Sequence, residues 1–292
     1  MNKFFNPEIT SWSSLVQRPL YSLDSVKDVV DGIFNNVELY GDKSLIDYTN
    51  KFDNVKLTDL KINADKISNS EKNIDKELKD AINIAFDNIY KFHENQIYKS
   101  KKIETTKGVL CWQEKRAIEN VGLYIPGGTA PLFSSVLMLA IPAMIAQCKN
   151  IVLCSPPDKN GELHPAILYC AKLCKIDTVI SVGGAQSIAA MSLGTETVPK
   201  VNKIFGPGNQ FVTYAKLKSI NFNTAIDMPA GPSELLVVAD KYANPNYIAS
   251  DLLSQAEHGP DSQVIFVSLS KSLIDDVEKC IYDQIKNLDR KD

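Results

Sequence analysis

Apolar residues recur at every third or fourth position in two stretches of the N-terminal part of the chain. The first stretch runs from Ser25 to Tyr40, and the second runs from Leu78 to Phe92. This spacing places the apolar side chains on one face of a helix, because an α-helix has about 3.6 residues per turn. The pattern therefore predicts an amphipathic helix over each stretch.

The pattern changes near Val121, where short apolar runs begin to alternate with longer amphipathic stretches. The short runs predict buried strands at Val121–Ile125, Ile151–Cys154, Thr178–Val182 and Lys203–Phe205. The longer stretches predict helices at Phe133–Gln147, Leu163–Leu173, Ala185–Leu193 and Phe211–Lys218. Strands that alternate with helices through short loops are typical of an α/β fold, with a parallel sheet covered on both faces.

A second, shorter series of the same kind follows Ser233. It predicts strands at Leu235–Ala239 and Gln263–Ser268, and helices at Tyr247–Gln255 and Leu273–Lys286. A chain of 292 residues has room for two domains of ordinary size. We therefore expect one α/β domain over 121–233 and the start of a second α/β domain over 234–292.

Composition and charge narrow the class of protein. The formal charge of −3 and the intermixed acidic and basic residues give no basic stripe, so we expect no nucleic-acid partner. The longest apolar run, Val136–Ala146, is too short to cross a membrane, and no signal peptide is recognisable. We expect a cytoplasmic protein without a membrane partner. Its six cysteines contain no Cys-x-x-Cys pair, which predicts reduced thiols.

Glycine and proline gather where the predicted strands end. The loops concerned are Pro126–Pro131, Gly183–Gln186, Gly206–Asn209 and Met228–Glu234. Ligands of an open parallel sheet bind outside the carboxyl ends of its strands, so several such loops together favour a binding crevice. The dinucleotide motif Gly-x-Gly-x-x-Gly is absent, because Phe211 stands where its third glycine belongs.

A second group of candidate residues is Gln255 and His258. They lie three residues apart at the end of a predicted helix, so their side chains share one face. Imidazole nitrogen and amide oxygen are both metal ligands, although most Gln-x-x-His pairs are caps or surface groups. With three histidines in all, the chain has no multi-histidine metal site of its own.

Five segments together resemble the motif series of the histidinol dehydrogenase family, in the family's order and close to its spacing. They are Val121–Gly128, Val182–Gln186, Phe205–Asn209, Asp227–Glu234 and Ser254–Ser262. The match is dense from about Val121 to Val267 and thinner before it. Family members oxidise L-histidinol through the aldehyde to L-histidine with two NAD-dependent hydride transfers, as zinc-dependent homodimers.

The resemblance implies Rossmann-like parallel sheets in a fold related to aldehyde dehydrogenases. The N-terminal helical region, 1–120, would then pack with 234–292. The positions that match NAD-contacting residues are Tyr124, Gln186 and Asn209. The substrate-contacting positions are Ser233, Gln255 and His258, of which Gln255 and His258 also match two zinc ligands.

The catalytic residues of the family are not matched in this sequence. The family's paired Glu-His acid/base, an Asp zinc ligand and a last His zinc ligand lie beyond the equivalent of Asp292. The Glu257-His258 pair belongs to the zinc motif. We therefore expect an apparently truncated histidinol dehydrogenase that binds NAD weakly, holds zinc poorly and does not turn over histidinol. Two alternatives remain: a related zinc- and NAD-dependent dehydrogenase of another alcohol, and an inactive remnant that survives as a partner-binding domain.

Overall fold

A computed structural model describes residues 1–17, 24–127, 131–229, 233–258 and 262–288. The contacts divide the chain into two compact units. We call Leu23–Ala230 the central unit, and Met1–Ser22 together with Gly231–Asp292 the terminal unit. Each unit is described by itself.

The central unit is built around a five-stranded sheet whose neighbouring strands are all parallel. Its strands are β3 (Asn120–Tyr124), β4 (Asn150–Cys154), β5 (Thr178–Ile180), β6 (Lys203–Phe205) and β7 (Ala225–Ile226). They lie in the order β5-β4-β3-β6-β7. The chain therefore moves outward from β3 in one direction, returns, and continues from β6 in the other. This is the strand order of doubly wound sheets, with a switch point between β3 and β6.

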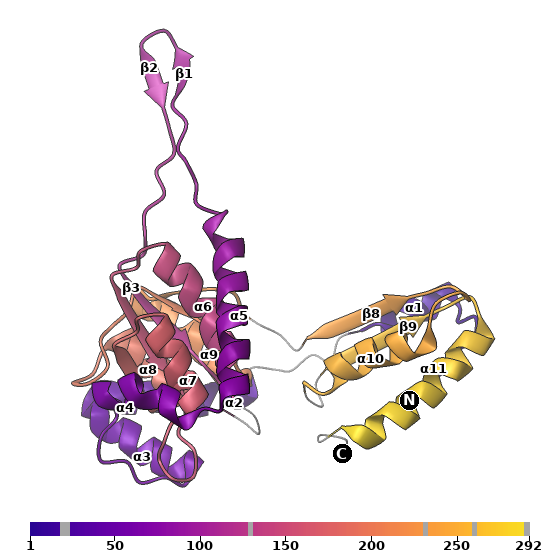
Figure 1. Ribbon diagram of the computed structural model, residues 1–292, viewed down its shortest axis with the longest axis horizontal. Coiled ribbons are helices and arrows are strands. Elements are labelled where there is room, and N and C mark those ends of the chain that lie inside the picture. Colours follow the sequence, from indigo (N-terminus) through magenta and orange to yellow (C-terminus); the bar gives the residue numbers. More distant parts are fainter. Residues whose placement is uncertain (18–23, 128–130, 230–232, 259–261, 289–292) are drawn as a thin grey trace. The chain divides into compact units, whose positions relative to one another are not determined.

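Helices cover both faces of this sheet, as the alternating pattern predicts (Figure 1). One face packs against α2 (Asp24–Tyr40), α3 (Asp42–Asp53), α8 (Gly184–Leu193) and α9 (Gln210–Ser219). The other packs against α4 (Ala64–Asn69), α5 (Lys76–Glu94), α6 (Phe133–Ile145) and α7 (Pro165–Leu173). Successive residues of β4 face opposite cores, with Val152 in the first and Leu153 in the second. The expected α/β fold with a parallel sheet is confirmed.

The N-terminal helices belong to the central unit. The packing of the N-terminal helical region, 1–120, with 234–292 stays a prediction. The two predicted helices are present as α2 and α5. They pack on helices that cover the sheet, α2 on α8 and α9, and α5 on α6. On α2, for example, the ring of Phe34 stacks on that of Phe222 at 5.4 Å. Only the first 22 residues join the chain after Ala230. The apolar faces of α2 and α5 are thus buried within the central unit, against these helices.

The sequence pattern did not predict a hairpin that extends from the central unit (Figure 1). Its antiparallel strands are β1 (Ile103–Thr106) and β2 (Val109–Cys111), and every residue of both is exposed. Two 3-10 turns, η1 (Ser70–Asn73) and η2 (Ile220–Phe222), complete the described elements of this unit.

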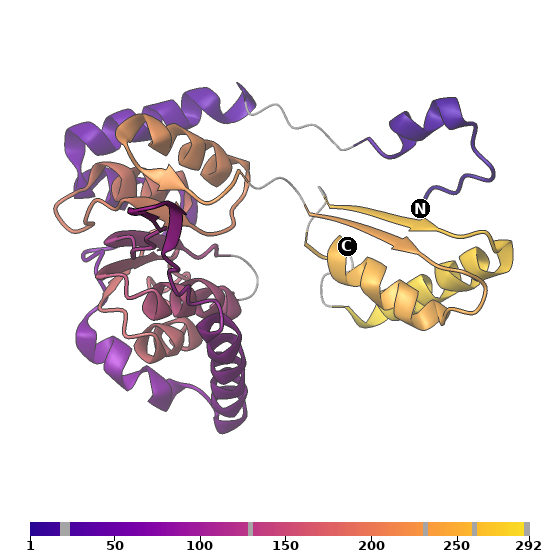
Figure 2. The same ribbon diagram turned by 90° about the horizontal axis from the view of Figure 1, so that it is seen from above.

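The terminal unit contains a two-stranded parallel sheet with helices on one face (Figure 2). Its elements are α1 (Ile9–Leu15), β8 (Glu234–Val238), α10 (Pro245–Ala256), β9 (Gln263–Val267), α11 (Lys271–Gln284) and η3 (Ile285–Asn287). The core lies between the sheet, α10 and α11. Lys3 joins the first residues of the chain to α11 through ion pairs with Asp275 and Glu278.

Candidate functional site

The loops after β3 and β6 meet at the switch point of the central sheet. Gly206, directly after β6, has a φ of +134°, which an L side chain rarely adopts. A Cβ atom there would lie 2.1 Å from the carbonyl oxygen of Tyr124, the last residue of β3. Only glycine allows this close approach, so the two loops form one packed edge at the place where doubly wound sheets bind ligands.

Tyr124 is buried at this edge, with 4% of the residue exposed. Its hydroxyl oxygen accepts a hydrogen bond from the Gly184 N–H at 3.3 Å, at the N-terminus of α8. Burial raises the pKa of the Tyr124 hydroxyl to about 12, and the charges of Asp53 and Cys154 act in the same direction. The side chain is therefore a neutral phenol that ties the end of β3 to the start of α8.

Gln186 lies in the first turn of α8, and 2% of the residue is exposed. Its Oε1 atom would lie 2.6 Å from a Cβ placed on Gly184, so the amide folds back over the N-terminus of the helix. Within the described residues the amide has no hydrogen-bond partner. An amide both donates and accepts, so it is free to bind a polar ligand at this edge.

Asn209 is exposed and caps α9. Its Oδ1 atom accepts hydrogen bonds from the N–H groups of Phe211 and Val212, both at 3.1 Å. Asparagine is a preferred N-cap residue, so this position also has a purely structural role. The Nδ2 amide group is the part of the side chain left to contact a ligand.

An ion pair beneath the Gly206 loop was not recognised in the sequence analysis. The ammonium group of Lys216, on α9, donates to the Gly206 carbonyl oxygen at 2.7 Å and pairs with Asp227. The other carboxylate oxygen of Asp227 accepts the Gly206 N–H at 2.9 Å. One signal was available: Lys216 falls at helical spacing among the positions of α9 that are buried. These positions are Val212, Thr213, Ala215, Lys216 and Ser219.

The candidate substrate and metal residues all lie in the terminal unit. Ser233 is exposed, and its carbonyl oxygen accepts the Gln263 N–H at 3.3 Å. Gln255 is half-buried near the end of α10, and its Nε2 atom is buried without a partner among the described residues. His258 is exposed, and its backbone N–H donates to the Gln255 carbonyl oxygen at 3.3 Å. This backbone hydrogen bond links the last turn of α10, which carries Gln255, to the turn after the helix, which carries His258.

These two residues are an incomplete zinc site by donor chemistry. Catalytic zinc usually has three protein ligands and an open position. Among the described residues, no group of three His, Cys, Asp or Glu side chains is placed to hold a metal. An amide and an imidazole are neutral donors, and neither offsets the charge of the ion. A zinc site at Gln255 and His258 would therefore need further ligands.

Several motif residues lie outside the described part of the chain. They are Gly128–Ala130, Ala230–Pro232 and Gly259–Asp261.

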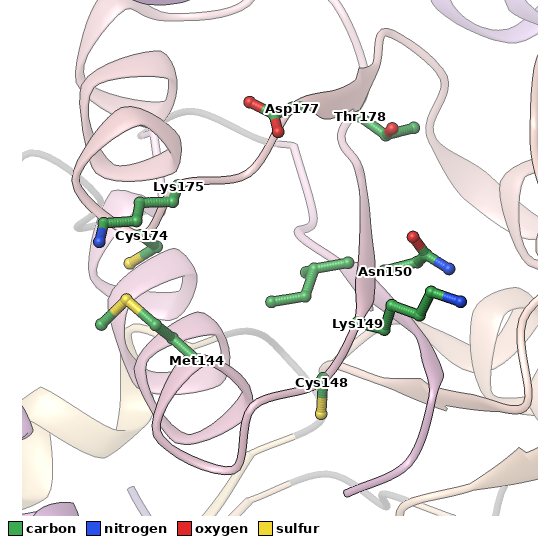
Figure 3. A pocket seen from close by; sticks show the side chains of 9 residues that line it. Met144, Cys148, Lys149, Asn150, Cys174, Lys175, Asp177 and Thr178 are labelled. Carbon is green, nitrogen blue, oxygen red and sulfur yellow. The ribbon is translucent and has the colours of Figure 1, made fainter.

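A small hollow lies at the opposite edge of the central sheet (Figure 3). Its volume is about 200 Å³, and it is bordered by Asn150 and Thr178, the first residues of β4 and β5. Ligands of doubly wound sheets bind at the carboxyl ends of the strands. This hollow is therefore separate from the switch-point edge formed by Tyr124 and Gly206.

Among the described residues, none of the helices has both the length and the apolar character needed to cross a membrane.

The strand order and the loops at the switch point define a doubly wound α/β protein, a class that binds ligands at this edge. Comparison with known families makes the assignment more specific. The family profile described as Histidinol dehydrogenase matches residues 16–292. The chain belongs to the histidinol dehydrogenase family, a family of oxidoreductases.

Individual relatives agree with this assignment. Histidinol dehydrogenase from Bacteroides fragilis is 51% identical over 286 residues, which is 98% of this chain and 67% of that protein. The Escherichia coli K12 enzyme is 50% identical over 279 residues, or 94% of this chain and 63% of that protein. The crystal structure of histidinol dehydrogenase from Elizabethkingia anophelis matches with a TM-score of 0.94 and 50% identity, covering 99% of this chain and 66% of that one. The chain thus spans about two thirds of the length of these relatives.

Proposed function

We propose that the chain binds NAD at the switch point of the central unit and takes part in the oxidation of L-histidinol to L-histidine. The observation that carries the proposal is the position of Tyr124, Gln186 and Asn209. These residues come from three loops, at the carboxyl ends of three strands or the helix starts that follow them. Membership of the histidinol dehydrogenase family supports the choice of NAD and of histidinol.

The residues of the central unit bind and orient the dinucleotide, which supplies the hydride acceptor when bound. The Gln186 amide, which has no partner within the described residues, hydrogen-bonds the ligand. Asn209 does so through Nδ2 while its Oδ1 holds the start of α9. Tyr124 lines the edge with a neutral hydroxyl whose oxygen is already bound to Gly184.

The residues of the terminal unit bind the substrate. Gln255 and His258 hold the zinc ion together with ligands outside this pair, and Ser233 contacts the substrate. Zinc supplies a positive charge that attracts the imidazole and amino nitrogens of histidinol. The family resemblance also supports a homodimer, a cytoplasmic location and a relationship to the aldehyde dehydrogenase fold.

Calorimetric titration of this chain with NAD tests the nucleotide site. We expect measurable binding, weakened about tenfold in Gln186→Ala by loss of one amide interaction. The control is Gln113→Ala, since Gln113 is exposed in the segment after β2. An absence of heat with folded protein at millimolar NAD contradicts the site. If Gln186→Ala and the wild-type chain bind NAD with equal affinity, Gln186 is not part of the nucleotide site.

Zinc binding tests the terminal unit. We expect weak binding by this chain, because metal affinity depends strongly on a full ligand set and two neutral donors are placed. His258→Ala should abolish it, while His93→Ala, in α5 of the central unit, should leave it unchanged. Tight, stoichiometric zinc that survives His258→Ala, measured by elemental analysis, would contradict the assignment.

A further inference from the structure

The peptide groups on both sides of Gly206 are held by one ion pair, whose lysine is buried. The Gly206 N–H is bound by Asp227, and the Gly206 carbonyl oxygen is bound by Lys216. Lys216 and Asp227 also bind each other, which closes a ring around this residue. The Lys216 side chain is 4% exposed and that of Asp227 is 26% exposed, so the lysine end of the ring is the end shielded from water.

The ring fixes the loop that carries a proposed NAD contact. Gly206 is pressed against the Tyr124 carbonyl oxygen on one side. Three residues further on, Asn209 begins α9, the helix that also carries Lys216. Asp227 comes from the other direction, directly after β7, and its own N–H donates to Ile204 in β6. Three separate elements thus hold the loop in one conformation.

We infer that Lys216 and Asp227 are a positioning pair that keeps the Gly206–Asn209 loop in its NAD-binding conformation. The inference rests on the proposed function of this edge and adds two residues that do not touch the ligand. A loop that is already ordered binds without the cost of ordering. When only a fraction of molecules has the competent loop, the apparent Kd rises by the reciprocal of that fraction.

The chain offers a matched control for the general effect of losing an ion pair. Lys218, two residues further along α9, pairs with Asp31 on α2, and their side chains are 17% and 33% exposed. This pair joins two helices and lies away from the Gly206 peptide groups. Lys218→Met therefore removes a partly buried lysine from the same helix without releasing the loop.

The test measures NAD affinity by calorimetry for the wild-type chain, Lys216→Met, Asp227→Asn and Lys218→Met, with a thermal unfolding curve for each. We expect the Kd to rise about tenfold or more in the first two variants and to stay within about twofold in Lys218→Met. An unchanged Kd in both Lys216→Met and Asp227→Asn would overturn the inference. Equal weakening by Lys218→Met would do so as well, because the effect would then be one of general stability.

The double variant Lys216→Met with Asp227→Asn separates positioning from stability. Replacing both partners removes the unpaired buried charge, so the unfolding temperature should recover relative to the single variants. The NAD affinity should remain low, since the ring around Gly206 is still missing. Affinity that recovers together with the unfolding temperature would overturn the inference.

Failure of the proposed function has a different signature. If the wild-type chain does not bind NAD, both the proposed nucleotide site and the positioning role are contradicted. If the wild-type chain binds NAD and both single variants bind it with the same Kd, the nucleotide site stands and only the positioning role is contradicted.

Discussion

The central and terminal units both contain parallel strands, but they cover them differently. In β3 four of five residues are buried, because helices lie on both faces of the sheet. In β8 exposed and half-buried residues alternate, because α10 and α11 lie on one face. The side chain of Leu235 points to that core, whereas Leu236 is 59% exposed. The number of sheet faces covered by helices thus accounts for the difference in burial between the two sets of strands.

The comparison shows how the proposed nucleotide edge is held in place. Its loops leave strands that are fixed by cores on both sides, and its backbone is further held by Lys216 and Asp227. The candidate zinc residues instead lie at the end of α10, over a sheet with one covered face.

The largest expected effect comes from deleting a leucine in each sheet. Leu153 in β4 is fully buried, so Leu153→Ala should lower the free energy of unfolding by about 3 kcal/mol. Leu236→Ala in β8 should change it by no more than about 0.5 kcal/mol, because that side chain is already exposed. Urea unfolding of both variants measures the difference. Similar losses would mean that the outer face of β8 is covered in solution.

The next effect is a loss of stability in alkaline solution. The folded-state pKa of Tyr124 is about 12 against an ordinary 10.0. The stabilisation from the neutral phenol is therefore complete below pH 10 and is lost as the pH rises to 12. The loss amounts to about 2–3 kcal/mol. In Tyr124→Phe this contribution is absent, so the wild-type chain should lose more stability than the variant over that range. Parallel pH profiles of urea unfolding would contradict the prediction.

Two helix caps provide a third, smaller comparison. Asn209 caps α9 and Asn244 caps α10, where its Oδ1 accepts the Asn246 N–H at 2.9 Å. Each substitution by alanine should lower stability by about 1 kcal/mol. Asn209→Ala should also weaken NAD binding, whereas Asn244→Ala should not. If calorimetric titration shows that both variants bind NAD like the wild-type chain, Asn209 acts only as a helix cap and does not contact NAD.

The smallest expected effect concerns Gln255. Its Nε2 atom is buried without a partner among the described residues, which is an unfavourable state for a polar group. Gln255→Met should therefore leave the unfolding free energy unchanged or raise it by up to about 1 kcal/mol, while zinc binding falls. Chemical denaturation measures the first quantity and elemental analysis the second. A clear loss of stability would show that the amide has a structural partner.

The sequence predicted the central sheet well because its strands are covered on both faces and therefore read as continuous apolar runs. The predicted strand Lys203–Phe205 matches β6 in both limits, and Thr178–Val182 ends two residues beyond β5. The hairpin of β1 and β2 was missed because all its residues are exposed and lack a core-facing pattern. The neighbours of α2 and α5, which are α8 and α9 for the first and α6 for the second, were not predicted, since periodicity shows an apolar face without showing what covers it.

The sequence offered the candidate residues of the site, but it did not reveal the hydrogen bonds that hold them in place. The glycine-rich loops predicted a binding crevice, and the resemblance to the family's motif series singled out Tyr124, Gln186 and Asn209 within it. The link between Tyr124 and Gly184 joins residues 60 positions apart, and the bond between Gly206 and Asp227 spans 21 positions. Such contacts depend on the tertiary fold, and no local pattern reports them.

The contact between Lys3 and Asp275 has a consequence for the synthesis of the protein. These residues are separated by 272 positions, and the whole central unit is translated between them. At ribosomal rates of about 5–20 residues per second, Lys3 waits roughly 15–50 s for its partner. The central unit therefore has time to fold on the ribosome while the first 22 residues remain unpaired. Nascent-chain proteolysis should find the central unit protected before the N-terminal segment is.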